Sequence, residues 1–282
     1  MNGLKKSSIL SKVLSSLLPA LPLFGYTNIS EIKPSKEIYS LAQFLSPKES
    51  KEIARRIWKN ECGNKIENLT FWSPYEDFPS LGIGHFIWLP KDCKSPFQET
   101  FPELLAFLKK RKAKLPSWLY KTKNCPWKTR KQFYKKFQSK KMQELRRFLY
   151  ENPSEQAIFM INRLENALEK ITKNLSEEEK KHVCKQFYRI AKEPLGVYAL
   201  TDYVNFKGEG ASSLESYNGH NWGLLQVLLN MEISEKAPPL EAFSKSAKTI
   251  LIQRVQNAPP RKNEKRWIQG WLNRVDTYKQ AF

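Results

Sequence analysis

One glutamate stands where a carboxyl group could act as a general acid. Ile53, Ile57 and Glu61 follow one another at four-residue spacing, so a helix through them carries Glu61 on its apolar face. A carboxylate on such a face is costly unless it has a partner or a chemical role. Glu61 would also end the helix, where burial and the negative end of the helix dipole both favour the protonated acid. These conditions suit a proton donor near neutral pH, although a helix-end glutamate paired with Lys or Arg would have the same spacing.

The segment after Glu61 carries further polar groups. Its motifs are Leu69-Thr70, Tyr75-Glu76-Asp77 and Ser80-Leu-Gly-Ile-Gly-His85. Together with Asn60-Glu61, these motifs resemble the active-site segment of the phage-type lysozymes and their relatives. The resemblance implies a lysozyme-like fold that acts on the glycan strands of peptidoglycan, with Glu61 as the acid.

The same resemblance implies roles for four other residues. The loop is longer than in the small phage enzymes, so either Glu76 or Asp77 could be the second carboxylate. Ser80 stands where threonine is usual, and its hydroxyl could orient a water or a sugar. His85 matches the family's histidine, which we expect to support the loop through hydrogen bonds, with a catalytic part as the alternative. The two glycines before it would let the strand pass close beneath a sugar, or would simply belong to an ordinary hairpin.

A second group of polar residues lies far downstream. Glu209 is followed fourteen positions later by the start of a Gly-Leu-Leu-Gln tetrad that ends at Gln226. This pair resembles the glutamate and Gly-Leu-Met-Gln signature of soluble lytic transglycosylases, although we expect no regular helix before the glutamate. Because one fold does not need two such acids, we expect Glu61 at the reaction centre. The opposite, substrate-binding wall of the cleft would contain Glu209, Tyr217, Asn221 and Gln226. The alternative for Glu209 is a tight surface turn.

The reaction depends on the second carboxylate. With Glu76 or Asp77 beside Glu61, the enzyme would be a muramidase that hydrolyses the glycosidic bond. With Glu61 alone, a group of the substrate would capture the cationic centre, as the resemblance to lytic transglycosylases implies. No metal or other cofactor is expected in either case.

The elements that position these residues are expected to be mainly helices. Ser46-Pro-Lys-Glu49 is a capping box with proline in the first turn, and it predicts a helix over about 47–61. Glycines, prolines and asparagines then predict turns and short strands near 66–90. Further helices are expected after residue 101 and over about 129–150, 158–171, 177–190, 222–231 and 240–256. The expected fold is mainly α (α+β): a single lysozyme-like domain over 40–282, with a small β-hairpin insertion near 66–90 and a basic helical insertion at about 105–150.

The positive charge is concentrated in one part of the chain. Of the net +20, residues 109–147 contribute sixteen basic residues and one acidic residue, a net +15. These residues lie outside both glutamate-containing segments. We therefore interpret them as a docking surface beside a cleft, with peptidoglycan or another anionic envelope polymer as the expected partner.

The N-terminus resembles an export signal. Lys5, Lys6 and Lys12 precede an apolar run over 13–25, which prolines interrupt and which is too short for an ordinary membrane span. We expect residues 1–30 to be a signal, with a membrane anchor or a plain leader as alternatives. The protein would then be located in the periplasm or cell envelope.

The four cysteines show no zinc-binding spacing. Cys93 and Cys125 both lie in proline-containing loop sequence, where a disulfide could form if the chain is exported. Unpaired thiols are the equal alternative.

Three function classes remain open. The first is a peptidoglycan-cleaving glycosidase with Glu61 as its acid. The others are a non-catalytic glycan binder and a nucleic-acid binder that uses residues 109–147, where aromatic residues alternate with lysines. The pattern over about 45–278 also resembles a set of uncharacterised bacterial proteins of similar length, which implies no activity.

Overall fold

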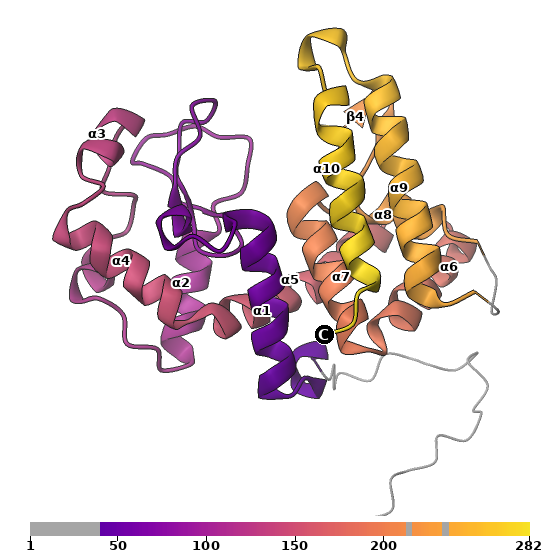
Figure 1. The fold of residues 1–282 in the computed structure, drawn as a ribbon, viewed down its shortest axis with the longest axis horizontal. Coiled ribbons are helices and arrows are strands. Elements are labelled where there is room, and N and C mark those ends of the chain that lie inside the picture. The colour runs from indigo at the N-terminus through magenta and orange to yellow at the C-terminus, as the bar shows by residue number, and fades with distance from the viewer. Residues whose placement is uncertain (1–39, 213–215, 233–236) are drawn as a thin grey trace, which may run out of the picture. The chain divides into compact units, whose positions relative to one another are not determined.

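Helices make up most of the computed structural model, which describes residues 40–282 apart from 213–215 and 233–236 (Figure 1). The fold is therefore mainly α with small antiparallel sheets, as the sequence predicts. The expected signal segment at 1–30 lies outside the described residues. Within those residues, no helix has the length and apolar character needed to cross a membrane. In chain order, the α-helices are α1 (Pro47–Cys62), α2 (Phe101–Lys110), α3 (Arg130–Lys135), α4 (Lys140–Glu151), α5 (Pro153–Thr172), α6 (Glu177–Ala191), α7 (Pro194–Lys207), α8 (Leu224–Leu229), α9 (Pro239–Asn257) and α10 (Lys265–Asp276).

The strands form two small antiparallel sheets. The first has the order β1-β2-β3, and the second pairs β4 with β5. In the first sheet Leu81 lies opposite both Thr70 and Phe86. The strand bounds are β1 (Thr70–Phe71), β2 (Ser80–Leu81), β3 (Phe86–Ile87), β4 (Ser216–Tyr217) and β5 (His220–Asn221). The first sheet thus lies within the 66–90 segment for which the sequence predicts short strands.

Helix α1 begins and ends where its local sequence predicts. The Ser46 hydroxyl accepts a hydrogen bond from the Glu49 amide, and the Glu49 carboxylate accepts one from the Ser46 amide, which completes the capping box. Gly63 ends the helix in the left-handed conformation, with φ 58°. The buried side chains of Ile53 and Ile57 lie on the face that packs against α5. This packing fixes the end of α1, and with it Glu61, relative to the centre of the domain.

The predicted helix over 129–150 is two helices rather than one. Helix α3 ends at Lys135, and α4 begins only at Lys140. The break occurs because the Ser139 hydroxyl accepts a hydrogen bond from the Met142 amide and so starts a new helix. The apolar spacing continues across the break because Phe137 still packs against the core.

The expectation that no regular helix precedes Glu209 is wrong. Helix α7 runs directly into Gly208, whose φ of 83° ends it. The residues from Gly196 to Tyr203 are all buried. A helix that is buried on every side has no one-sided apolar pattern, which is why its sequence did not reveal it.

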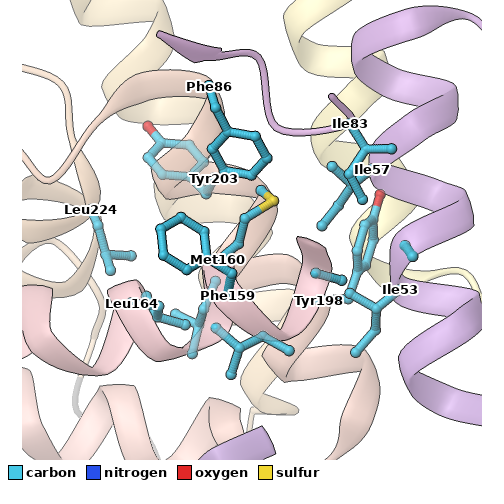
Figure 2. Packing of buried hydrophobic residues seen from close by; sticks show 14 of the residues in the cluster. Ile53, Ile57, Ile83, Phe86, Phe159, Met160, Leu164, Tyr198, Tyr203 and Leu224 are labelled. Carbon is cyan, nitrogen blue, oxygen red and sulfur yellow. The ribbon is translucent and has the colours of Figure 1, made fainter. Parts of the chain in front are cut away.

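A single hydrophobic core joins the sheet to the helices. Figure 2 shows Ile57 of α1, Ile83 and Phe86 of the sheet region, and Met160 of α5 and Tyr203 of α7 among its members. The edge of the Phe86 ring meets the ring of Phe159, with centroids 5.5 Å apart. Packing against α5 therefore holds the β2–β3 turn in place.

The glycines of the β2–β3 turn make room for α5. A Cβ built on Gly84 would lie 2.7 Å from the Phe86 ring and 2.9 Å from the Met160 sulfur. Gly82 has a φ of 73°, and a Cβ there would meet the Gln156 side chain. The Gln156 carbonyl oxygen accepts a hydrogen bond from the Ile83 amide. The close approach at these two glycines is thus made by the protein's own side chains, whereas the sequence suggested a sugar.

Candidate active site

A cleft of about 780 Å³ lies between the β2–β3 turn, α5, α7 and the loop after α7. Gly84 and His85 come from the turn. Helix α5 supplies Arg163 and Lys170, and Glu209 lies in the loop. Of the three glutamates to which the sequence assigned a role, the cleft is lined by Glu209, together with the predicted histidine.

Glu61 is not among the residues that line this cleft, and it lies one position before the end of α1. Its Oε1 accepts a hydrogen bond from Arg274 Nη2 at 2.5 Å and one from Asn205 Nδ2 at 3.1 Å. Its Oε2 lies 3.5 Å from His85 Nδ1. Asn205 and His85 both line the cleft, so Glu61 is one contact away from it through two different residues. The carboxyl group is mostly buried, with 14% of the side chain exposed.

Arg274, from α10, is shared between Glu61 and a second carboxylate. Its Nε and Nη2 donate to the two oxygens of Asp202, each at 2.8 Å. Asp202 is fully buried and also accepts hydrogen bonds from the Tyr278 hydroxyl and from Asn60. Burial lowers the pKa of Arg274, but the charges of Asp202 and Glu61 more than offset this and hold it well above its usual value.

Counting charges in this cluster leaves one negative charge without a cation. The carboxylates of Glu61 and Asp202 share the single guanidinium of Arg274. Both oxygens of Asp202 accept hydrogen bonds from it. An unpaired charge in a buried cluster is costly, so the two carboxylates also depend on the hydrogen bonds that Asn205, Tyr278 and Asn60 donate to them. The arrangement thus gathers two carboxylates around one cation, next to two residues that line the cleft.

His85 is a neutral neighbour of this cluster. Burial lowers its pKa, the negative charge of Glu61 opposes that shift, and Arg274 adds to it. Its ring stacks on Phe71 with centroids 6.3 Å apart, and its Nε2 lies 3.7 Å from the Cys62 sulfur. His85 also has a left-handed backbone, with φ 51°. Ring stacking and these contacts fix its orientation toward Glu61.

Glu209 lies in the loop that follows α7. Its carboxylate is 3.6 Å from Lys170 Nζ and is 30% exposed. The loop is held by Gln226, whose side chain donates to the Gly210 carbonyl and accepts from the Gly223 amide. Glycine is required at 223 because a Cβ there would collide with the backbone of Gly210. Gln226 therefore shapes the loop that carries Glu209 and is not among the residues that line the cleft.

The other predicted residues are not brought to this cleft. Glu76 and Asp77 line a different pocket of about 490 Å³, next to Lys128 and Arg130. Burial raises the pKa of Glu76. Ser80 is buried in the first sheet, where it pairs with both neighbouring strands.

Two residues expected on the substrate-binding wall have structural partners instead. The Tyr217 hydroxyl donates to Glu264 at 2.9 Å. The Asn221 amide donates to the Ser212 carbonyl at 2.7 Å. Both residues support the second sheet and the loop near it, and neither is among the residues that line the cleft.

The sequence reasoning missed the residues that surround Glu61. Asp202 and Asn205 stand three positions apart in an otherwise apolar stretch, and this polar pair on one face of a helix was the available signal. Arg274 carried no comparable signal, because its role depends on a contact across 213 positions.

The cysteines and possible metal ligands add no chemistry to this site. All four cysteines are free thiols in the structure. Burial, together with the charge of Glu61, raises the pKa of Cys62 to about 12, so this thiol beside His85 stays protonated. Among residues 40–282, excluding the two undescribed gaps, no group of three or more His, Cys, Asp or Glu side chains is placed to hold a metal ion. In comparisons with protein-family models, curated proteins and solved structures, nothing matches this chain.

Proposed function

We propose that this protein is a glycosidase that cleaves the glycan strands of peptidoglycan, with Glu61 as the general acid. The observation that carries the proposal is the cluster of Glu61, Asp202 and Arg274, which has one negative charge in excess and contacts two residues of the cleft, His85 and Asn205. As a general acid, Glu61 would deliver a proton to a bound substrate. The resemblance of the segment around Glu61 to phage-type lysozymes supports the same assignment.

The hydrogen bonds of Glu61 indicate which oxygen carries the proton. Oε1 accepts from both Arg274 and Asn205, and this interaction is strongest when that oxygen bears the negative charge. Oε2 is therefore the oxygen that takes the proton, beside the neutral ring of His85. In the reaction, this proton would pass to the glycosidic oxygen as the bond to the anomeric carbon breaks.

Glu209 replaces Glu76 and Asp77 as the candidate for the second carboxylate. It lines the same cleft as His85, whereas the two hairpin residues line another pocket. As a general base, Glu209 would activate a water for hydrolysis, with Lys170 Nζ 3.6 Å from its carboxylate. If Glu209 only binds substrate, a hydroxyl of the sugar captures the cationic centre and the enzyme is a lytic transglycosylase.

The charges on the α5 wall suit a glycan that carries acidic groups. Arg163 and Lys170 both line the cleft. Peptidoglycan carries carboxylates on its peptide stems, and these would be attracted to the two cations. The proposal places the protein in the cell envelope, in keeping with the export-like N-terminus of the sequence.

The test is to incubate purified peptidoglycan with the wild type and with Glu61→Gln and to identify the released muropeptides by mass. We expect release by the wild type and its loss in Glu61→Gln. Products with reducing ends would indicate hydrolysis, and anhydro ends would indicate transglycosylation. Release that is unchanged in Glu61→Gln would contradict the role of Glu61, and no release by either protein would favour a non-catalytic glycan binder.

A further inference from the structure

The basic residues of 109–147 form an exposed surface that is separate from the cleft. Fifteen of the sixteen basic side chains are exposed, and only Arg146 is buried. The one acidic residue of the segment, Glu144, is half-buried. These side chains come from the end of α2, from α3 and α4, and from the loops between them (Figure 1). We call this surface the basic face. None of its residues lines the cleft.

Most aromatic residues of the same segment are buried or half-buried. Trp127 and Phe133 are buried, and their ring centroids are 5.3 Å apart in an edge-to-face contact. Trp118 contacts both Trp88 and Trp127. In this segment the large hydrophobic side chain that is exposed is Tyr120, which lies under Lys109. The segment therefore lacks the open aromatic platform on which a single-stranded nucleic acid would stack its bases.

The buried Arg146 explains how the face is held in place. It donates to the Thr70 hydroxyl of β1 at 2.8 Å and to the Phe137 carbonyl, and its guanidinium lies 3.9 Å from the centroid of the Phe137 ring. Arg130 donates to the Trp72 carbonyl from α3. Two of the four arginines thus tie the face to the first sheet, and a third, Arg111, pairs with Glu155.

The cations left free for a partner are mostly lysines. A lysine ammonium is a hydrated point charge on a flexible stem, whereas an arginine offers the planar fork that recognises individual phosphates in fixed geometry. A broad set of exposed lysines therefore fits a partner that is itself an extended, mobile array of negative charge. An anionic membrane surface is such an array, and it attracts each nearby basic side chain by about 1 kcal/mol.

The N-terminal sequence offers a second membrane signal in the same molecule. Lys5, Lys6 and Lys12 precede the apolar run over 13–25. A short apolar anchor alone gives weak, reversible membrane binding, and stable attachment generally needs a polybasic patch as a second signal. The basic face has the charge that such a second signal requires.

We propose that the basic face docks the protein onto an anionic phospholipid membrane by electrostatic attraction. The proposal does not depend on the glycosidase activity. It assigns the exposed lysines of residues 109–147 to a lipid partner and leaves the cleft free for substrate.

The test uses full-length protein and two variants with equal changes in charge. The first replaces five exposed lysines of the basic face with glutamate: Lys114, Lys121, Lys128, Lys131 and Lys140. The control replaces five exposed lysines elsewhere: Lys51, Lys65, Lys173, Lys180 and Lys262. Binding is measured by co-sedimentation with phosphatidylcholine vesicles that contain about one-third phosphatidylglycerol, and with vesicles of phosphatidylcholine alone.

The wild type should bind the anionic vesicles and release them at about 1 M salt, where the Debye length is only about 3 Å. The basic-face variant should bind at least about 100-fold more weakly, and the control about tenfold more weakly or less. A second basic-face variant with glutamine at the same five positions should also lose binding. This glutamine variant keeps the test decisive if the glutamates disturb folding.

Three results would overturn the proposal. Equal binding by the basic-face and control variants would show that the face is not the docking surface. Binding that survives high salt would assign attachment to the apolar N-terminus. Tighter binding to duplex DNA or to peptidoglycan sacculi than to anionic vesicles, lost in the basic-face variant, would identify a different polyanion as the partner.

Discussion

Arg274 Nη2 lies 2.5 Å from Glu61 Oε1, although the two residues are 213 positions apart. The contact joins α1, whose end carries Glu61, to α10 near the end of the chain. Helix α10 itself packs along α9, and the two run side by side in Figure 1. The environment of Glu61 therefore depends on the completion of the C-terminal helices.

Removing Arg274 should strongly destabilise the protein. In Arg274→Gln, the buried Asp202 loses its cation and keeps only neutral hydrogen-bond donors. We expect the free energy of unfolding to fall by about 3–5 kcal/mol, the usual cost of leaving a buried charge unpaired. Urea denaturation measures the change. The exposed Arg261→Gln should shift the same quantity by less than about 0.5 kcal/mol.

A double variant separates lost pairing from lost packing. Asp202→Asn combined with Arg274→Gln removes both charges, so the loss should be smaller than the sum of the two single losses. Simple additivity would mean that Asp202 and Arg274 do not stabilise one another.

The titration of His85 should report the charge on Glu61. Burial holds the pKa of His85 below its ordinary 6.5, and the charge of Glu61 opposes that shift. In Glu61→Gln, the NMR titration midpoint of His85 should therefore move further down. For a histidine with a lowered pKa, stability falls as the pH drops below 6.5, because the unfolded chain then binds a proton that the folded state excludes. A midpoint that rises in Glu61→Gln would contradict the observed proximity.

Lys207 should make the free energy of unfolding depend on pH between about 6 and 10.5. Burial and, to a smaller extent, the charge of Arg254 lower its pKa to about 6, while the charge of Glu264 opposes the shift. Its Nζ lies 3.3 Å from the centroid of the Trp271 ring, which favours the ammonium form and also opposes burial. Between pH 6 and the unfolded value of 10.5, only the unfolded chain binds this proton, so stability should rise with pH.

Lys207→Met tests this linkage. The variant should be more stable at pH 7 by on the order of a few kcal/mol, and its stability should change less between pH 6 and 10. Urea denaturation at a series of pH values provides the measurement. Parallel curves for the wild type and the variant would show that Lys207 keeps its proton in the folded protein.

Adding a methyl group at Gly84 should disturb the turn that carries His85. The new Cβ would press on Phe86 and Met160, so Gly84→Ala should lower stability by about 1–3 kcal/mol. Gly270 is the matched control, because it lies inside α10 with open space around it. Gly270→Ala should stabilise the protein by about 0.5–1 kcal/mol, since alanine favours a helix interior. Thermal unfolding of the two variants should therefore shift in opposite directions.

Local signals in the sequence were sufficient for the parts of the fold that depend on neighbouring residues. The capping box at Ser46 and Glu49 places α1, and the one-sided apolar pattern of α5 is equally local. Helix α7 lacks such a pattern because it is buried all round. Because this helix was not predicted, its polar residues Asp202 and Asn205, which belong to the environment of Glu61, were not predicted either.

The candidate site was predictable only in part, for the same reason. Glu61, His85 and Glu209 were named from short motifs, and the structure brings His85 into contact with Glu61 and onto one cleft with Glu209. Glu76 and Asp77 followed from the same motifs, yet they line another pocket. Which carboxylates come together depends on how helices that are far apart in the sequence pack. The spacing of residues along the chain does not predict that packing.

The central claim is that Glu61 is the acid of a glycan-cleaving site and that Glu76 is not part of it. The most direct measurement compares the initial rates of muropeptide release by the wild type, Glu61→Gln and Glu76→Gln at one pH. We predict that Glu61→Gln lowers the rate by about 10²–10⁴-fold, the usual contribution of a general acid, and that Glu76→Gln changes it by less than about threefold. A large loss in Glu76→Gln together with normal activity in Glu61→Gln would contradict the account.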